Sequence, residues 1–392
     1  MVRVILHKGE ERRLKSGHLW VFSNEIREVT GDRQPGAAAE FYSAGGEFLG
    51  SGYDNHHSLI AGRLLSRERC DVNAVDFFRG RLAAAQAYRQ EIYPGWQTYR
   101  LVHGEGDLLP GLVVDRYGDY LAVQLLTAGL DRRREQVVAA LVELFAPRGI
   151  IARNDVPVRS LEGLDQEVAV LAGTIPERLT TEEHGLSFQV DLMAGQKTGH
   201  FLDQKENHLL LNGLVAGKDV LDCFCYAGSW GIHAAAYGAR SVTCLDISPR
   251  ACQLVSDNTE LNRVAERVSV EQVDVFDRLR SLRGEGRRFD TIILDPPAFV
   301  KSRKTLREAE KGYLTINRRA LELLRPGGCL VTCTCSYHLG REEFRGIIAR
   351  AAQQAGRTVR LRSVNGQAPD HPVLLAVPET EYLKCLVVQT ID

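Results

Sequence analysis

The stretch DVLDCFCYAGSWG, residues 219–231, is the best guide to the fold class of the C-terminal half of this 392-residue chain. It runs from a short apolar segment into a turn with Gly228 and Gly231, which is typical of a buried strand followed by a helix. More apolar segments follow at intervals that leave room for helices, and this alternation predicts a doubly wound, mostly parallel α/β sheet. These segments are SVTCLDI (241–247), VSVEQVDV (268–275), DTIILDPP (290–297) and GCLVTCTC (328–335).

The N-terminal half has a different pattern. Residues 1–70 are rich in glycine and in short β-like runs, which predicts a small β-barrel. Residues 76–93 carry apolar side chains at helical spacing and predict a linking helix. From 99 to 190 strand-like and helix-like segments alternate, with a hairpin over 111–126 and an amphipathic helix over 131–145. We therefore predict three domains, at 1–70, 71–190 and 191–392.

Composition limits the class of protein. Hydrophobic residues make up 44% and charged residues 25%, as in ordinary folded proteins. No signal-like leader follows Met1, no apolar run approaches the roughly 20 residues that span a bilayer, and nine irregularly spaced cysteines suit a reducing compartment. We expect a cytoplasmic protein with no membrane partner. The net charge of -1 does not by itself indicate a nucleic-acid partner.

The predicted strand ends suggest a cofactor site. Asp222 precedes the glycine turn, where an acid would repel a pyrophosphate but attract the cationic amino group of S-adenosylmethionine. Asp246 and Asp274 close the next two strands, where they would meet the ribose hydroxyls and the adenine amine. Each acid could instead cap the helix that follows it. Asp222 and the absence of a full G-x-G-x-x-G pattern disfavour a nicotinamide cofactor.

The next two strands carry the candidate chemistry. The fourth strand ends in DPPAF (295–299), whose prolines stiffen the exit and withhold two N–H donors. An aromatic directly after the prolines would favour methylation of an exocyclic amine, but Ala298 takes that place. Cys335 ends the next strand and should lie beside Asp295. A thiolate there could add to C6 of a pyrimidine and make C5 nucleophilic, which methylation at C5 requires.

The neighbouring cysteines are interpreted as structural. Cys333 lies inside an apolar strand, as buried thiols often do. The pairs Cys223/Cys225 and Cys333/Cys335 also lie on strands, whereas structural zinc sites prefer wider cysteine spacing on turns. We predict no metal site.

Two basic segments are candidates for RNA contact. Residues 301–319 carry seven basic and two acidic side chains directly after the fourth strand, and these could clamp phosphates around an extruded base. The alternative is a solvated amphipathic helix. The N-terminal stretch is also locally basic. The candidate RNA-binding residues are Lys8, Arg12, Lys15, Phe299, Lys301 and Arg303.

Over nearly its full length the chain resembles the bacterial large-subunit rRNA cytosine-5 methyltransferases that carry an N-terminal PUA domain. No single motif is specific, but together they are. The motifs are KGEERRLKSGHLWVFSNEI (8–26), VHGEGDLLPGLVVDRYGD (102–119), EEHGL (182–186), GQKTGHFLDQKEN (195–207), DCFCYAGSWG (222–231), DPPAFVKS (295–302), CTCS (333–336) and DHPVLLAVPETEYLK (370–384).

The resemblance implies a PUA barrel, an EEHGL-type α+β domain and a Rossmann-like methyltransferase domain with a seven-stranded, mostly parallel sheet. It also implies that Cys335 is the nucleophile and that Asp295 positions the base. The sequence departs from the family pattern at His200, where an aromatic is expected, and at Lys205, where arginine is expected; strand four lacks the second cysteine of other RNA cytosine-5 enzymes. The cofactor-binding residues predicted from strand ends and resemblance together are Phe201, Asp203, Gln204, Asp222, Tyr226, Gly228, Asp246, Asp274, Asp295 and Pro296.

We therefore predict an enzyme that methylates C5 of a cytosine in large-subunit (23S) rRNA through a covalent Cys335–C6 adduct, converting S-adenosylmethionine to S-adenosylhomocysteine. The alternative targets are uracil C5 and an exocyclic amine; the thiol would serve uracil equally, whereas an amine does not need it. A non-catalytic RNA-binding or ribosome-assembly protein is the alternative from another class. The sequence does not decide the oligomeric state, for which a homodimer is one candidate.

Overall fold

The computed structural model describes residues 1–299 and 306–392, and the chain divides into two compact units. The first unit consists of Met1–Thr181, Val190–Leu202 and Pro369–Thr380. The second unit consists of Glu182–Gln189, Asp203–Ala368 and Glu381–Asp392. None of the described helices is long and apolar enough to cross a bilayer.

The N-terminal part of the first unit is a six-stranded sheet of order β2-β6-β5-β4-β1-β3. The β1–β4 pair is parallel, and the remaining pairs are antiparallel. A Cβ at Gly52 would lie 1.9 Å from the carbonyl oxygen of Arg63, so only glycine lets β5 and β6 approach this closely. The elements are β1 (Val2–Leu6), α1 (Glu11–Lys15), β2 (Trp20–Val21), β3 (Ile26–Thr30), β4 (Ala37–Tyr42), β5 (Phe48–Asp54) and β6 (Gly62–Ser66).

The rest of the first unit is built on a five-stranded sheet of order β11-β10-β9-β8-β7. The predicted hairpin is confirmed as the antiparallel pair β8–β9, and the predicted linking helix is α2. Its buried side chains, among them Phe78 and Leu82, share a core with Leu101 and Val114 of the sheet. The elements are α2 (Val75–Ile92), β7 (Thr98–His103), β8 (Leu112–Tyr117), β9 (Tyr120–Leu125), α3 (Ala128–Asp131), α4 (Arg134–Phe145), β10 (Gly149–Arg153) and β11 (Val168–Gly173).

The EEHGL motif forms a tight turn between two short strands, β12 (Leu179–Glu183) and β13 (Leu186–Val190). His184 and Gly185 occupy it with φ angles of 48° and 79°. Two consecutive left-handed residues are the requirement of the commonest two-residue hairpin turn, which is why glycine stands at the second position.

The second unit contains a seven-stranded sheet of order β16-β15-β14-β17-β18-β20-β19. The first five strands of that order pair in parallel, and β20 and β19 pair antiparallel. This confirms the predicted seven-stranded, mostly parallel sheet. The strands are β14 (Asp219–Cys223), β15 (Ser241–Asp246), β16 (Val268–Gln272), β17 (Phe289–Leu294), β18 (Leu324–Thr334), β19 (Val359–Asn365) and β20 (Lys384–Thr390).

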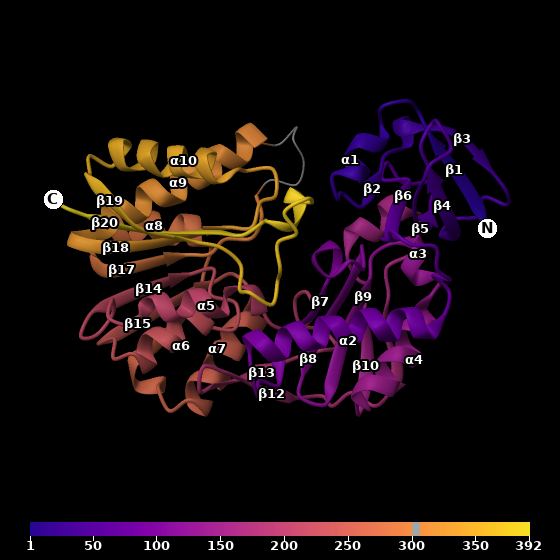
Figure 1. The fold of residues 1–392 in the computed structure, drawn as a ribbon. Coiled ribbons are helices and arrows are strands. Elements are labelled where there is room, and N and C mark those ends of the chain that lie inside the picture. Colours follow the sequence, from indigo (N-terminus) through magenta and orange to yellow (C-terminus); the bar gives the residue numbers. More distant parts are fainter. Residues whose placement is uncertain (300–305) are drawn as a thin grey trace. The chain divides into compact units, whose positions relative to one another are not determined.

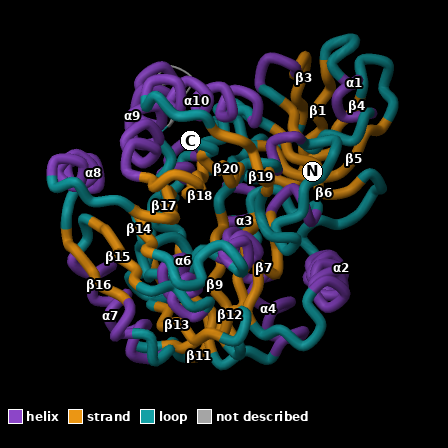
Figure 2. Tube along the Cα trace, turned by 90° about the vertical axis from the view of Figure 1, so that its left-hand side faces the viewer, coloured by secondary structure: helices purple, strands orange, loops and turns teal. Residues whose placement is uncertain are grey.

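Helices cover both faces of this sheet (Figures 1 and 2). On one face α8, α9 and α10 pack on alternate strand residues such as Ile292 and Leu330. On the other, α6 and α7 pack on the intervening residues such as Ile293 and Val331. The strands are therefore apolar on both faces, as the continuous runs in the sequence predict. The helices are α5 (Lys205–His208), α6 (Ser229–Ala236), α7 (Pro249–Leu261), α8 (Val275–Gly284), α9 (Leu306–Leu323) and α10 (Arg341–Gln354).

Candidate functional site

The carboxyl ends of parallel strands meet at one edge of the seven-stranded sheet. Cys223 of β14 is level with Leu294 of β17, which is level with Thr332 of β18. Asp295 directly follows β17, and Cys335 directly follows β18. The strand register thus brings the predicted acid and thiol to the same edge, where strand order switches between β14 and β17 and α/β sheets bind their ligands.

The turn between β14 and α6 has an uncommon backbone conformation. Phe224, Tyr226 and Gly228 have φ angles of 63°, 47° and 79°. The N–H of Tyr226 donates to Asp246 Oδ2 at 3.0 Å, so the acid at the end of β15 holds the turn in place. A Cβ at Gly228 would lie 3.0 Å from Val255 Cγ1, which leaves little room for a side chain. Left-handed residues other than glycine are found where a binding site over-determines the backbone.

Asp222 is fully buried within β14. Its Oδ2 accepts a hydrogen bond from the N–H of Gly231 at 2.9 Å, and its Oδ1 has no hydrogen-bond partner among the described residues. Burial, together with the neighbouring charges of Asp295 and Asp246, raises the pKa of the Asp222 carboxyl to about 8. The carboxyl therefore lies where a cation would be strongly stabilised.

Asp295 is held by two side chains from distant segments. Its Oδ2 accepts hydrogen bonds from Gln204 Nε2 and from Trp230 Nε1, both at 3.0 Å. Asn207 Nδ2 donates to Gln204 Oε1 at 2.6 Å and orients the amide. The following Pro296 is buried. Sequence reasoning missed Trp230, although its place just after the glycine turn was an available signal.

Asp203 and Phe201, which the family resemblance suggests as cofactor-binding residues along with Gln204, belong to different units. Asp203 is in the second unit, where its Oδ2 accepts a hydrogen bond from the Tyr382 hydroxyl at 2.7 Å and its carbonyl accepts one from the Ala368 N–H at 2.9 Å. Phe201 is in the first unit, where the Lys197 ammonium lies 4.2 Å from its ring centroid. Their roles in cofactor binding stay predictions.

The two cysteines of the CTCS motif have different environments. Cys333 is fully buried, and burial beside Cys385 raises the pKa of its thiol well above the usual range. Cys335 lies beyond the end of the strand and is only partly buried. Because a nucleophilic thiol must reach its substrate and ionise, Cys335 is the better candidate of the two.

The residues on either side of Cys335 in the sequence belong to one hydrogen-bonded network. The Thr334 hydroxyl donates to the Tyr313 hydroxyl at 2.8 Å, and the Tyr313 and Ser336 hydroxyls are 2.9 Å apart. Lys384 Nζ donates to the Ser336 carbonyl at 3.2 Å. Burial lowers the pKa of the Lys384 ammonium, while the charges of Glu381 and of an ionised Cys335 act on it in the opposite direction. By the same interaction, the ammonium would stabilise a thiolate at Cys335.

Asp274 performs the helix-capping role that the sequence left open as an alternative. It is exposed, and its Oδ1 accepts a hydrogen bond from the Asp277 N–H at 3.0 Å at the start of α8. An N-cap accepts such a bond with one oxygen, so the second oxygen is not committed by the cap. Contact with adenine stays a prediction for Asp274.

The candidate RNA-binding residues are dispersed. Lys8, Arg12 and Lys15 are exposed around α1 of the first unit, with Lys15 Nζ 2.5 Å from Glu47 Oε2. The Phe299 ring packs in the second unit against Tyr313 at 4.7 Å and Phe276 at 6.0 Å between centroids. The remaining two, Lys301 and Arg303, lie outside the described residues. Their roles in RNA binding stay predictions.

Asp222, Asp246 and Asp295, here called the carboxylate cluster, suit the predicted cofactor. S-adenosylmethionine carries positive charge on its sulfonium and amino groups and offers ribose hydroxyl donors. Three neighbouring acids, one of them with a buried oxygen that lacks a partner among the described residues, would stabilise those charges. The left-handed turn next to them allows a ligand to approach the backbone closely.

Comparison with known proteins identifies the family of the chain. Residues 4–67 match a model described as a PUA-like domain, and residues 100–374 match one described as an S-adenosylmethionine-dependent methyltransferase. Proteins named ribosomal RNA large subunit methyltransferase I are 39% identical over 388 residues in Pseudoalteromonas atlantica, covering 98% of both chains, and 40% identical over 387 residues in Vibrio cholerae, covering 97% of both.

Solved structures agree with these matches. A protein from Streptococcus mutans assigned as a SAM-dependent methyltransferase superposes with a TM-score of 0.85 at 26% identity, covering 99% of this chain and 100% of its own. A structure assigned as a methyltransferase complexed with SAH gives 0.87 at 25% identity with the same coverage. The predicted PUA-like domain and the Rossmann-like fold are confirmed.

Proposed function

We propose that this chain, which belongs to the family of S-adenosylmethionine-dependent methyltransferases, methylates C5 of a cytosine in large-subunit ribosomal RNA. The names of its relatives support the RNA class, and a PUA-like domain is consistent with RNA binding. The observation that carries the choice of C5 is Cys335, a partly buried thiol at the sheet edge that also holds Asp295.

S-adenosylmethionine is the cofactor of this family, and when bound it supplies an electrophilic methyl group. We assign its recognition to the carboxylate cluster and to the turn at Tyr226 and Gly228, with Phe201, Asp203, Gln204, Asp274 and Pro296 as further candidates. The carboxylates would hold the cationic and hydroxyl groups of the ligand. The left-handed turn would let it contact the backbone.

The proposed role of Cys335 follows from the electronic structure of cytosine. The thiolate donates an electron pair to C6, a carbon–sulfur bond forms, and C5 becomes enamine-like. C5 then takes the methyl group, and S-adenosylhomocysteine leaves with the electron pair of the broken sulfur–methyl bond. Loss of the C5 proton to a base returns electrons to the ring, expels the cysteine sulfur and restores the aromatic base.

Asp295 is proposed to select cytosine. Gln204 and Trp230 donate to one oxygen of its carboxylate and hold the group in one orientation. A fixed carboxylate accepts hydrogen bonds, so it suits the 4-amino group of cytosine and is repelled by the 4-oxo group of uracil. This favours cytosine over uracil, which the thiol alone does not.

Lys384 is proposed as a positioning residue for the nucleophile. Its ammonium donates to the carbonyl of Ser336, the residue after Cys335, and the two charges influence each other. A cation beside a thiol lowers the pKa of that thiol and raises the fraction present as thiolate.

The test is transfer of labelled methyl from S-adenosylmethionine to ribosomal RNA, followed by mass spectrometry of the nucleosides. We expect 5-methylcytidine with the native chain, none with Cys335→Ala, and product with the matched control Cys333→Ala. Methyluridine would shift the target to uracil. Methylation of an amine, or an active Cys335→Ala, would refute the covalent mechanism.

A chain that binds the cofactor but methylates neither naked nor particle-bound RNA would be the non-catalytic RNA-binding protein instead. RNA containing 5-fluorocytidine separates these cases. After methyl transfer its C5 carries fluorine in place of the proton that a base would remove, so the cysteine is not expelled and the adduct persists. We expect a protein–RNA adduct that survives denaturation, formed by the native chain and by Cys333→Ala but not by Cys335→Ala.

A further inference from the structure

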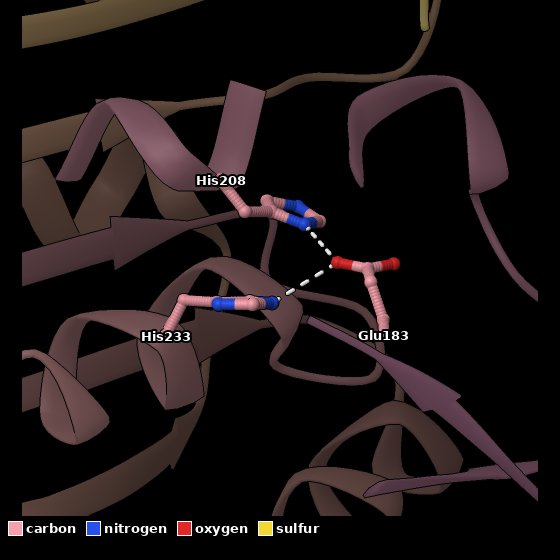
Figure 3. Close-up of side chains that lie close together, drawn as sticks. All are labelled: Glu183, His208 and His233. Atoms are coloured by element: carbon pink, nitrogen blue, oxygen red, sulfur yellow. Dashed lines mark hydrogen bonds and ion pairs between the residues drawn. The ribbon is translucent and has the colours of Figure 1, made fainter. Parts of the chain in front are cut away.

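Three buried side chains of metal-ligating type, none of them part of the carboxylate cluster, converge in the second unit. Glu183 ends β12, His208 ends α5 and His233 lies within α6. Figure 3 shows both imidazoles turned toward one carboxylate oxygen. His208 Nδ1 is 2.5 Å and His233 Nε2 is 3.0 Å from Glu183 Oε1. We call these three residues the imidazole cluster.

The imidazole cluster is closed to solvent. Relative exposure is 2% for Glu183, 1% for His208 and 0% for His233. Its potential ligand atoms all lie within 4.8 Å of one another. An ionised carboxylate this deeply buried is stabilised by hydrogen bonds and by nearby positive charge. A divalent cation bound by all three side chains would add to that stabilisation.

Neighbouring groups orient the His233 imidazole. The other ring nitrogen of His233, Nδ1, is 3.2 Å from the Tyr237 hydroxyl. The His233 ring stacks with the ring of Phe188, at 5.9 Å and 28°, and with that of His208, at 5.0 Å and 23°. A hydrogen bond to the second nitrogen and a fixed ring plane are what metal-binding histidines require, because they set the tautomer and direct the lone pair.

We propose that Glu183 Oε1, His208 Nδ1 and His233 Nε2 form a binding site for a divalent transition metal ion, with zinc as the most suitable. Two neutral imidazoles and one carboxylate are a ligand set that zinc accepts. Ligand atoms about 2 Å from zinc would be about 3.3 Å apart, so only small shifts convert the hydrogen-bonded cluster into a coordinated one. This revises the sequence-based prediction of no metal site, which considered cysteines alone.

The site would have a structural role with a consequence for the carboxylate cluster. It would join β12, α5 and α6, and α6 starts directly after the Gly228 turn. The His208 ring also contacts the ring of Trp230 at 4.7 Å, edge to face, and Trp230 donates to Asp295. Metal binding would therefore immobilise the side chain that orients Asp295, without touching substrate.

The test uses the full chain without a histidine tag, stripped with a chelator and then titrated with Zn²⁺ or Co²⁺. We expect about one equivalent to be retained after gel filtration, visible Co²⁺ bands of nitrogen and oxygen ligation, and a midpoint of thermal unfolding at least about 3 °C higher with Zn²⁺. His233→Gln and His208→Gln should lose all three effects. His103→Gln, which removes a partly buried imidazole from the first unit, should retain them.

The rival explanation is a hydrogen-bonded cluster neutralised by Lys205, which is buried and acts electrostatically on nearby His184. That explanation predicts no retained metal in the native chain, and this result would overturn the proposal. Equal binding by the native chain and both histidine variants would overturn it too, as would sulfur-to-cobalt charge-transfer bands, which would assign the metal to cysteines. If His233→Gln does not fold, His208→Gln decides.

Discussion

The carboxylate cluster and the imidazole cluster lie in the same unit but balance charge in opposite ways. In the carboxylate cluster, burial and the neighbouring charges of Asp295 and Asp246 raise the pKa of Asp222 to about 8. In the imidazole cluster, the single carboxylate of Glu183 faces two groups that can donate to it. Like charges are close together in the carboxylate cluster, whereas complementary hydrogen-bonding groups meet in the imidazole cluster.

The way in which charge is balanced distinguishes a ligand site from a structural site. Acids that lie close together destabilise the ligand-free fold. Their presence therefore indicates a site for a ligand that carries positive charge. A cluster whose groups complement one another can stabilise the fold by itself or with a bound ion. The following tests separate the two clusters by the sign and size of their effects.

The largest expected effect is on catalysis. Asp295→Asn should lower kcat/KM for methyl transfer by about 10²–10³-fold, because it removes a preorganised charge at the reacting base. Asp290→Asn is the matched control on the same strand, since Asp290 accepts hydrogen bonds from Arg325 and the Asp219 N–H instead. Steady-state kinetics with ribosomal RNA measures both. Full activity of Asp295→Asn would mean that the Asp295 carboxylate has no role in catalysis.

Stability should change with opposite sign in the two clusters. Glu183→Gln should lower the free energy of unfolding by about 2 kcal/mol, because the acceptor that the two buried imidazoles share loses its negative charge and one of its oxygens is replaced by a donor. Asp222→Asn should leave it unchanged or raise it at neutral pH, because a buried acid with a pKa of about 8 has to take up a proton on folding and asparagine does not. Urea unfolding measures both, with exposed Glu182→Gln as a control expected within about 0.5 kcal/mol of native. Loss of stability in both clusters would contradict the comparison.

Cofactor affinity should depend on pH through Asp222. Its pKa is raised to about 8 without ligand, and a bound cation would lower it, so binding releases a proton. Affinity for S-adenosylmethionine should therefore weaken by up to about tenfold per pH unit as pH falls below 8. Calorimetric titration from pH 6 to 9 measures it.

The control for that titration is Asp222→Asn, which leaves the ligand's own amino group to titrate but removes the acid. Its affinity should be weaker at pH 8 and should lack the steep loss below it. Parallel pH profiles for the native chain and the variant would mean that Asp222 does not face the cofactor.

The smallest expected effect is on thiol ionisation. Lys384→Met should raise the pH midpoint for alkylation of Cys335 by about half to one unit, since a nearby cation is lost. Lys384→Arg should keep the native midpoint. Peptide mass spectrometry after timed iodoacetamide treatment follows Cys335, with buried Cys333 as an internal unreactive reference. An unchanged midpoint in Lys384→Met would remove the lysine from the proposal.

Much of the site was predictable because it depends on local patterns. The strand–turn–helix signature placed Asp222 and Asp246 at neighbouring strand ends, and the same reasoning placed Asp295 and Cys335 at one edge. In a parallel sheet the carboxyl ends coincide whatever the side chains are. The start of the strand predicted over 328–335 was less well placed, since β18 begins at Leu324 and its pairing with β17 shifts in register before Cys329.

The rest depends on side chains that meet from distant parts of the chain. Gln204 and Trp230 are 91 and 65 residues from Asp295, the carboxylate they orient. His208 and His233 are 25 and 50 residues from Glu183. Hydrophobic periodicity and motif spacing do not predict these side-chain contacts, because the contacts depend on how helices pack on the sheet and not on any one segment.

The sequence was sufficient to predict the class of sheet, the order of its strands along the chain, and the positions of the acids and the thiol at strand ends. These features depend on hydrophobic periodicity and turn residues, which act within one segment. Only the tertiary structure decided which of these groups are buried, which are oriented by a partner and which have a shifted pKa. Those properties depend on desolvation and on charges within a few ångströms, and both exist only once separate segments have packed together.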